Sequence, residues 1–478
     1  VLTLALALWL AACGGITNNG QVSLQLPQLT PSNAPTQEAA PSAEQRETAR
    51  ILATYGGVYR NAQLQVMIGS MVDRLVAASE KPTQKYEVTL LNSPAINAFA
   101  LPDGHLFVTR GLVTLANDKA ELASVLAHEM GHVIAHHAQI RAEKERQIAL
   151  ADHVMTDVVS DPHMSALALA KSKLALASFS RAQEFEADGI GVGISARTGF
   201  DPYGASRFLA DMQRKADFKS HGHAGDNGVP DFLANHPSTP ARVQKVLADA
   251  RADAKPGSGE RDRNAYLAEL DGIVYGEDPG EGFVRGRRFL QPKLGFTFLA
   301  PPGFTLDNSA QAVTGLKTSG SEAMRLDVVS VPAEQPLAGY LKSGWMDNVD
   351  PASATEFSLN GFAAATATAK GEPWSFRLYV VRFGSDVYRF IYAAKLMTAQ
   401  SDRSFRESIM SFRRMSLKES REIKPLRVKI VTVGAHDTVA SLARRMAVTD
   451  HRIERFRVLN GLGPKDEVKP GERVKIVA

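Results

Sequence analysis

Residues Glu121–His137, ELASVLAHEMGHVIAHH, decide how the rest of the chain is organised. Apolar side chains recur in this stretch at the spacing of an α-helix. Residues four apart share one face of a helix, so His128 and His132 point in the same direction. Asp118 and Glu121 have the spacing of a capping box, which predicts that the helix opens there.

His128 and His132 provide half of a zinc site, because two neutral imidazoles on one helix face are suitable ligands. Glu129 lies beside them and reaches a metal-bound water without being a ligand, the H-E-x-x-H arrangement of metalloproteases. The alternative is a helix with two surface histidines. Against that alternative, a buried helix rarely carries such polar groups unsatisfied, and the flanking residues are apolar: Leu122, Val125, Leu126, Val133 and Ile134.

The third ligand must come from another part of the chain, and Glu184 is the best candidate. Asp188 follows four residues later on the same predicted helix and would accept the N–H of a ligand histidine. Glu186 is a rival carboxylate that faces another side of the helix. His136 and His137 extend the first helix, but one helix does not wrap three ligands around a tetrahedral metal, so we interpret both as structural.

Three motifs together resemble the zinc metallopeptidase family that includes HtpX, BepA and the CAAX prenyl endopeptidases. They are H-E-x-x-H at His128–His132, E-F-x-A-D at Glu184–Asp188 and H-P-x-x-x-x-R at His236–Arg242. A fourth stretch, Asn97–Gly104, resembles the edge strand beside the active site of that family. The resemblance covers roughly residues 46–255 and selects the first carboxylate of E-F-x-A-D as the third ligand.

The resemblance implies a set of roles. One Zn²⁺ per chain is held by His128, His132 and Glu184, while Asp188 fixes the tautomer of a ligand histidine. Glu129 takes a proton from the attacking water and delivers it to the leaving amine. An extended substrate pairs with the edge strand by β-augmentation, and the residues concerned are Asn97, Ala98, Phe99 and Ala100.

His236 and Arg242 leave two alternatives open. Either side chain is a candidate to stabilise the oxyanion of the transition state. His236 also follows a Gly-rich polar loop, Ser220–Asn235, and is a candidate fourth zinc ligand that displaces the catalytic water. The sequence favours neither the substrate contact nor the inhibitory ligand.

Composition limits the class of protein. An apolar content of 44% and a charged content of 22% are typical of globular domains, and the length predicts two to four of them. The net charge of +4 is spread out, so nucleic acid is not an expected partner. No apolar span of about 20 residues follows the N-terminal region, so we expect the body of the protein to lie outside the membrane.

The N-terminal region predicts a lipid anchor. Val1–Leu10 is apolar and too short to span a membrane, as in a signal peptide, and the lack of an initiator Met suggests an incomplete start. Leu10-Ala11-Ala12-Cys13 resembles a bacterial lipobox, and Gly14 is not the Asp of an inner-membrane signal. We therefore expect lipidation of Cys13 and an outer-membrane lipoprotein facing the periplasm. An ordinary signal peptide is the alternative. As Cys13 is the single cysteine, no intramolecular disulfide is expected.

The last part of the chain, Val428–Ala478, resembles a LysM domain, a βααβ module that binds N-acetylglucosamine-containing glycans. The matching pieces include Val431-Thr432-Val433, Leu459-Asn460-Gly461 and Lys469-Pro470-Gly471. His436 stands where the family usually has Gly, in a loop of the glycan groove. The resemblance implies peptidoglycan as a partner; the alternative is a module used only for protein contacts.

We expect a multidomain α+β protein. Its peptidase domain is mainly helical with a small β-sheet, and a small antiparallel α+β domain follows, with strands at Leu294–Leu299, Arg325–Val331, Ser375–Phe383 and Asp386–Ala394. The predicted segments are a signal peptide with lipobox (1–13), a disordered tether (14–43), the metallopeptidase domain (44–255), a linker (256–282), the small α+β domain (283–417) and the LysM module (425–478).

These features predict a zinc endopeptidase of the bacterial cell envelope that cleaves unfolded or misassembled envelope proteins, anchored by lipid and peptidoglycan. The alternative is a lipid-anchored, peptidoglycan-binding scaffold or chaperone with a silent protease domain. The presence of Glu129 and of all three expected ligands disfavours that alternative.

Overall fold

The computed structural model describes residues 42–144, 146, 179–218, 232, 236–237 and 239–478. The chain forms two compact units, Val1–Arg46 and Glu47–Ala478. Cys13, the tether up to residue 41 and most of the Ser220–Asn235 loop lie outside the described residues. Within the described part, every helix is too short or too polar to cross a membrane.

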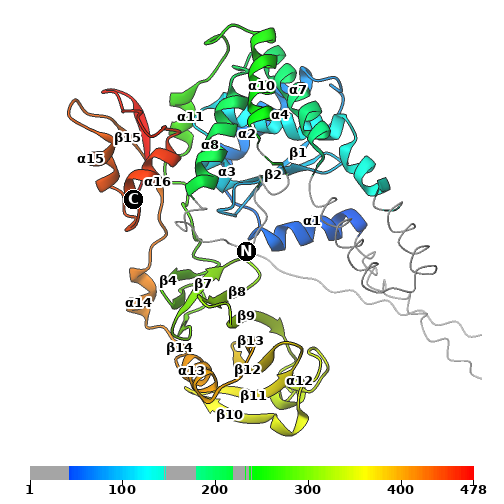
Figure 1. The fold of residues 1–478 in the computed structure, drawn as a ribbon, viewed down its shortest axis with the longest axis vertical. Helices are drawn as coiled ribbons and strands as arrows, with labels where there is room; N and C mark the ends of the chain where they lie inside the picture. Colours follow the sequence, from blue (N-terminus) through cyan, green and yellow to red (C-terminus); the bar gives the residue numbers. More distant parts are fainter. Residues whose placement is uncertain (1–41, 145, 147–178, 219–231, 233–235, 238) are drawn as a thin grey trace, which may run out of the picture. The chain divides into compact units, whose positions relative to one another are not determined.

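A helical region surrounds the central helix α4 (Figure 1). Every residue of α4 from Ala120 to His132 is buried, because α2, α7, α8 and strand β2 all pack against it. Asp118 is the N-cap and accepts a hydrogen bond from the Glu121 N–H. The helices are α1 (Ala43–Thr54), α2 (Ala62–Ala77), α3 (Arg110–Leu115), α4 (Lys119–Ile134), α7 (Arg181–Thr198), α8 (Gly204–Phe218), α10 (Pro240–Asp253) and α11 (Arg263–Glu269).

Two glycines let α4 and α7 touch backbone to backbone. A Cβ on Gly131 of α4 would lie 2.9 Å from the carbonyl oxygen of Ala187. A Cβ on Gly191 of α7 would lie 2.9 Å from the backbone nitrogen of His128. Such distances exclude any side chain at either position. The close approach brings the carboxylates of α7 against the histidines of α4.

A small sheet lies beside α4 and has the strand order β1-β3-β2, formed by Glu87–Leu91, His105–Thr109 and Ala98–Ala100. β1 pairs with β3 in parallel, whereas β2 pairs with β3 antiparallel. The sharp return between β2 and β3 uses Gly104 at φ 99°. β2 is thus an edge strand, and it contacts α4.

The segment that we predicted as a linker, 256–282, instead contains the packed helix α11. Tyr266, Leu267 and Leu270 are fully buried in the same core as α4. The Tyr266 hydroxyl donates to the carbonyl of Val113 at 2.6 Å. The polar run Lys255–Asp262 led us to extend the linker past these apolar residues, whose helical spacing covers only two turns.

A large antiparallel sheet region follows, in place of the small domain that we expected. A seven-stranded sheet has the order β10-β11-β12-β13-β9-β8-β7, and a four-stranded sheet has the order β14-β6-β5-β4. The strands are β4 (Phe283–Arg285), β5 (Arg288–Gln291), β6 (Phe296–Leu299), β7 (Phe304–Asn308), β8 (Val313–Lys317), β9 (Glu322–Ser330), β10 (Thr355–Leu359), β11 (Phe362–Lys370), β12 (Ser375–Phe383), β13 (Asp386–Ala394) and β14 (Arg413–Arg414).

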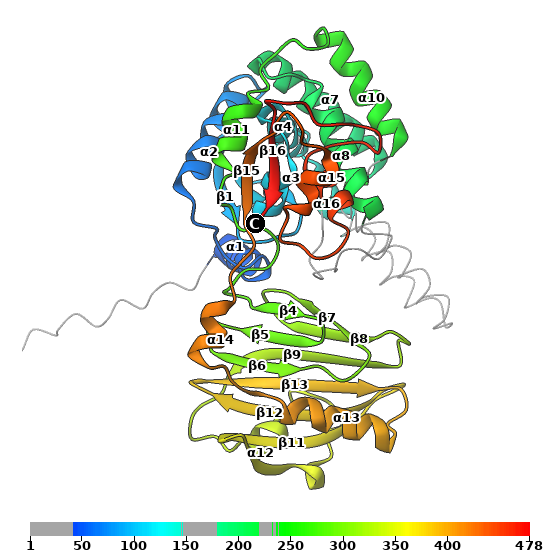
Figure 2. The ribbon, with the colours of Figure 1, turned by 90° about the vertical axis from the view of Figure 1, so that its left-hand side faces the viewer.

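Both faces of the seven-stranded sheet are buried. Along β12, Tyr379 and Val381 belong to one core, whereas Leu378 and Val380 belong to another, as the alternation of a strand requires. Figure 2 shows helix α13 (Ala399–Met410) lying across one face. The other face is covered by α12 (Leu337–Leu341). Two covered faces explain why these strands are rich in apolar residues.

The C-terminal segment after α14 (Leu417–Glu422) has the element order strand, helix, helix, strand. The elements are β15 (Val428–Thr432), α15 (Val439–Arg444), α16 (Arg452–Leu459) and β16 (Arg473–Val477). β15 and β16 pair antiparallel and share a core with α15 and α16, whereas Val428 of β15 belongs to the core around α4. Thr438 caps α15 with a capping box.

Candidate metal centre

Four ligand atoms from three segments meet in one buried cluster. His128 and His132 come from α4, Glu184 from α7 and His236 from the segment before α10, and their exposed fractions are at most 5%. His128 Nε2 lies 3.1 Å from His132 Nε2 and 3.3 Å from His236 Nδ1. His236 Nδ1 lies 3.1 Å from Glu184 Oε1.

These spacings suit a zinc ion. Ligand bonds of zinc to nitrogen or oxygen in a tetrahedron place the ligand atoms about 3.3 Å apart. Two further separations, from Glu184 Oε2 to His128 Nε2 and from Glu184 Oε1 to His132 Nε2, are 3.6 Å each. Burial lowers the pKa of His128, His132 and His236, so their rings are neutral with a lone pair free to bind a metal. The residues present therefore fit Zn²⁺.

Asp188 and Arg242 form a layer behind the cluster. His128 Nδ1 lies 2.9 Å from Asp188 Oδ1, so Asp188 holds the ring with Nε2 toward the cluster. Arg242 donates to both oxygens of Asp188, at 2.8 and 2.7 Å. Although burial opposes its ionisation, hydrogen bonds from Arg242 and His128 bring the pKa of Asp188 to about 2. The Asp188 carboxylate is therefore charged at neutral pH.

Arg242 lies in a different place from the one that we expected of an oxyanion-stabilising side chain. Its Nη1 lies 2.7 Å from Glu184 Oε2 and donates to the backbone carbonyls of His236 and Pro237, both at 3.2 Å. The guanidinium is 2% exposed and its donors are engaged by the protein. This geometry makes Arg242 a clamp that joins α7, α10 and the His236 segment.

His132 has its own support, which sequence reasoning missed. His137 Nδ1 lies 2.9 Å from His132 Nδ1, and His137 Nε2 lies 3.2 Å from Glu186 Oε2. Glu186, the rival ligand, therefore contacts His137 and not the cluster. α4 ends at Ile134, and His136, whose φ is 57°, lies in the turn that separates α4 from His137.

Glu129 lies between the cluster and the edge strand. Its carboxylate accepts a hydrogen bond from the backbone N–H of Ala100 in β2. Its Oε1 is buried without a hydrogen-bond partner among the described residues and lies 3.6 Å from His236 Nε2. Burial and the nearby Glu184 raise the pKa of Glu129 well above its usual range. A carboxylate in this state is suited to accept a proton.

A cleft of about 500 Å³ opens onto the cluster. It runs between α1, β2 and α4, and apolar side chains form much of its wall, with Ile51, Phe99, Leu101, Val133 and Phe179 among them. Glu129, His132 and His236 lie on its wall, as does Ala100 of the expected substrate strand. Asn97 and Ala98 are buried, and the Asn97 amide donates to the Tyr55 hydroxyl at 2.9 Å. Asn97 therefore supports the strand from behind.

Comparison with known proteins agrees with this geometry. Residues 60–250 match Peptidase family M48. The mitochondrial metalloendopeptidase OMA1 of Arabidopsis thaliana is 36% identical over 170 residues, 34% of this chain and 31% of that protein. The Beta-barrel assembly-enhancing proteases of Yersinia pestis and Escherichia coli K12 are 31% and 30% identical, over 44% and 42% of this chain and the same shares of their own lengths. Residues 60–250 are thus similar to the metallopeptidases of family M48, and the chain spans less than half the length of these relatives.

Proposed function

We propose that this protein is a zinc-dependent endopeptidase that cleaves unfolded or misassembled proteins of the bacterial cell envelope. The observation that carries the proposal is the cluster of His128, His132 and Glu184 beside Glu129, at the wall of a cleft that an edge strand borders. Two relatives bear the name Beta-barrel assembly-enhancing protease, which supports a role in envelope protein quality control.

His128, His132 and Glu184 would hold the zinc ion. When bound, zinc supplies Lewis-acid chemistry, polarising the scissile carbonyl and acidifying a water molecule. Glu129 accepts the proton of that water and passes it to the leaving amine, a transfer favoured by its raised pKa. An extended substrate pairs with β2, and the Ala100 N–H that now binds Glu129 is then available to it. Recognition through the backbone favours unfolded chains over folded ones.

His236 closes the site in the resting state. Its Nδ1 is within 3.3 Å of a ligand atom of both His128 and Glu184, which is the place of a fourth ligand. Stacking on Phe232, with ring centroids 4.4 Å apart, and the contact of Arg242 with its backbone hold it there. In this position His236 occupies the space of the catalytic water. Displacement of His236 by substrate would open the site.

Location and anchoring are further parts of the proposal. The lipobox-like Leu10–Cys13 supports an outer-membrane lipoprotein in the periplasm. The LysM-like sequence of Val428–Ala478 and its strand, helix, helix, strand order support binding to peptidoglycan. A protein anchored at both layers would act on chains that arrive at the outer membrane.

Cleavage of unfolded casein by the purified protein tests the activity. We expect cleavage that stops with a chelator and returns with zinc. Zinc-loaded protein that leaves casein intact, but suppresses aggregation of an unfolded client, would favour the scaffold or chaperone alternative.

A further inference from the structure

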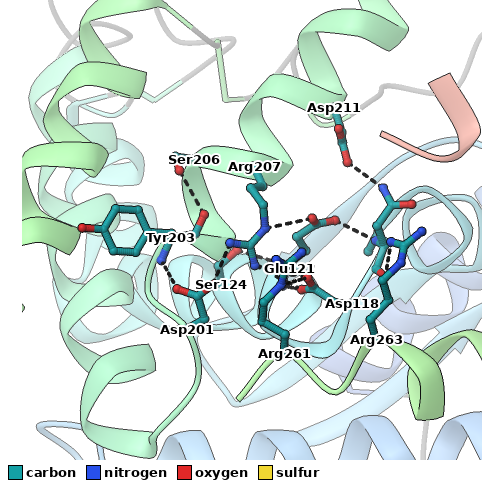
Figure 3. Close-up of polar contacts among 12 residues, drawn as sticks. Asp118, Glu121, Ser124, Asp201, Tyr203, Ser206, Arg207, Asp211, Arg261 and Arg263 are labelled. Carbon is teal, nitrogen blue, oxygen red and sulfur yellow. Dashed lines mark hydrogen bonds and ion pairs between the residues drawn. The ribbon is translucent and has the colours of Figure 1, made fainter. Parts of the chain in front are cut away.

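The opposite end of α4 holds a second buried cluster of charged residues (Figure 3). Asp118, Glu121 and Asp211 are each at most 2% exposed. Arg261 donates to Asp118 at 2.8 Å, and Arg207 lies 3.2 Å from Asp118 and 3.3 Å from Glu121. Figure 3 shows these guanidinium groups converging on the two carboxylates at the start of the helix.

Asn117 joins the separate carboxylates into one network. Its backbone N–H donates to Glu121 Oε2 at 2.7 Å, and its side-chain amide donates to Asp211 Oδ2 at 2.8 Å. Arg263 donates to the Asn117 carbonyl at 2.9 Å. These three hydrogen bonds therefore hold the turn between α3 and α4 in place.

Lys475, from the C-terminal strand β16, reaches this turn from 360 residues away in the chain. Its ammonium donates to the carbonyls of Thr114, Leu115 and Ala116 at 2.8, 3.1 and 2.9 Å. An ammonium has three N–H donors, so all of them are used. Lys475 is fully buried, and these three carbonyls lie at the end of α3, where the Leu115 carbonyl also accepts from the Asn117 amide at 3.2 Å.

The charged groups around Lys475 change its pKa in opposite directions. Burial lowers the pKa of Lys475, and Arg263 adds to this shift, but Glu121, Asp211 and Asp118 oppose it. A cation at the C-terminal end of α3 also compensates for the carbonyl groups of that helix. The buried carboxylates and the buried ammonium therefore depend on one another, although they belong to opposite ends of the chain.

The C-terminal segment is also closely packed around the contact between Lys475 and the turn before α4. Gly461 has φ 68°, and a Cβ there would lie 2.9 Å from Asn117 Nδ2 and 3.1 Å from Asp211 Oδ1. On the other side, β15 is hydrogen-bonded to the segment after α11, because the Val428 N–H donates to the Ile273 carbonyl at 2.9 Å. The segment is thus built into the peptidase region and is not a separate attachment.

We propose that Lys475 is a positioning residue for the metal helix. Its ammonium fixes the Thr114–Asp118 turn, from which α4 runs about 15 Å to His128. The C-terminal segment would thereby set the placement of the zinc ligands, so it contributes to the peptidase in addition to any binding of its own. This proposal rests on the proposed function, because it concerns the same metal site.

The test compares Lys475→Met with Lys429→Met in the full-length protein. Lys429 lies on the neighbouring strand β15, pairs with Ile476 and is exposed, so it is a matched control. Lys475→Met removes the ammonium donor of the three carbonyls at similar side-chain volume, and among the described residues only the Leu115 carbonyl keeps a second donor, the Asn117 amide at 3.2 Å. We expect zinc loss to a chelator to be about threefold faster and kcat on casein to fall while KM stays constant. Lys429→Met should behave as the wild type.

Other outcomes have definite meanings. If Lys475→Met lowers the unfolding temperature but leaves zinc loss and kcat unchanged, Lys475 only stabilises the fold and the proposal is overturned. If Lys475→Met does not fold, Lys475→Gln, which keeps two N–H donors, decides by the same zinc measurement. If the wild type does not cleave casein, the proposed function fails, and the rate of zinc loss still reports on Lys475.

Discussion

The two ends of α4 are both buried and polar, yet their polar groups are satisfied in different ways. At the C-terminal end, His128, His132 and Glu184 turn their ligand atoms toward one another, and Glu129 Oε1 lacks a hydrogen-bond partner among the described residues. At the N-terminal end, Asp118 and Glu121 each receive hydrogen bonds or ion pairs from other parts of the protein.

This difference distinguishes a cluster that serves the reaction from a cluster that stabilises the fold. Burial of a polar group without a partner costs free energy, so a cluster that lacks partners is maintained for a ligand. A cluster whose carboxylates are matched internally holds elements together, although at the N-terminal end Asn117 Oδ1 is buried without a hydrogen-bond partner among the described residues. Burial and charge alone do not separate the two, since both ends have them.

The largest expected effect tests the chemistry of the metal end. Glu129→Gln removes the proton acceptor but keeps the shape of the side chain, so casein cleavage should fall by about a thousandfold or more. Zinc content, measured by atomic absorption, should stay at the wild-type level. Substantial activity in a zinc-loaded variant would show that another group moves the proton.

The next prediction separates the two carboxylates of α7. Glu184→Ala removes a ligand and should lower zinc affinity by about a hundredfold. Glu186→Ala removes only the contact with His137, so zinc stoichiometry at saturating metal should be unchanged. The reverse pattern in the two purified variants would exchange their roles.

A change at the N-terminal end should act on stability. Asp118→Ala removes the helix cap and leaves Arg207 and Arg261 with one carboxylate fewer, which should destabilise the fold by about 2 kcal/mol. Urea unfolding measures the loss, and zinc should still bind the folded protein. If the variant kept its stability but lost its zinc, the N-terminal cluster would act on the metal site, and the proposed difference between the two ends of α4 would be wrong.

The smallest effect concerns His236, which belongs to the metal end but is not needed to hold the metal. His236→Ala should raise basal casein cleavage about threefold and keep zinc, because the fourth position becomes free for water. Initial rates and zinc content are measured in parallel. A lower rate at full zinc content would instead support the substrate contact.

Local signals in the sequence predict the elements that carry the metal end. The cap at Asp118 predicts the start of α4, where the structure places it. The end of α4 differs: we expected it at His137, but it ends at Ile134 because His136 is left-handed. β11, Phe362–Lys370, is absent from the strands that we predicted because it holds five alanines, and antiparallel pairing with β10 and β12 makes it a strand.

Such local signals do not predict contacts between segments that are distant in the sequence. Lys475 stands in an alternating strand, where a lysine ordinarily points to solvent. Nothing near it in the sequence marks the carbonyls of Thr114 and Ala116 as its acceptors. Likewise, the four residues between His132 and His137 give no sign that the second ring supports the first.

The close approach of α4 and α7 at Gly131 and Gly191 has a consequence for metal selectivity. No side-chain layer separates the helices there, so the distance between their ligands cannot adjust by repacking. Zinc, with bonds of about 2.0–2.2 Å, suits such a fixed frame. A larger cation such as Ca²⁺, with bonds of about 2.3–2.6 Å and more ligands, would have to push two backbones apart. The close contact at the two glycines thus favours a small cation such as Zn²⁺ over a larger one such as Ca²⁺.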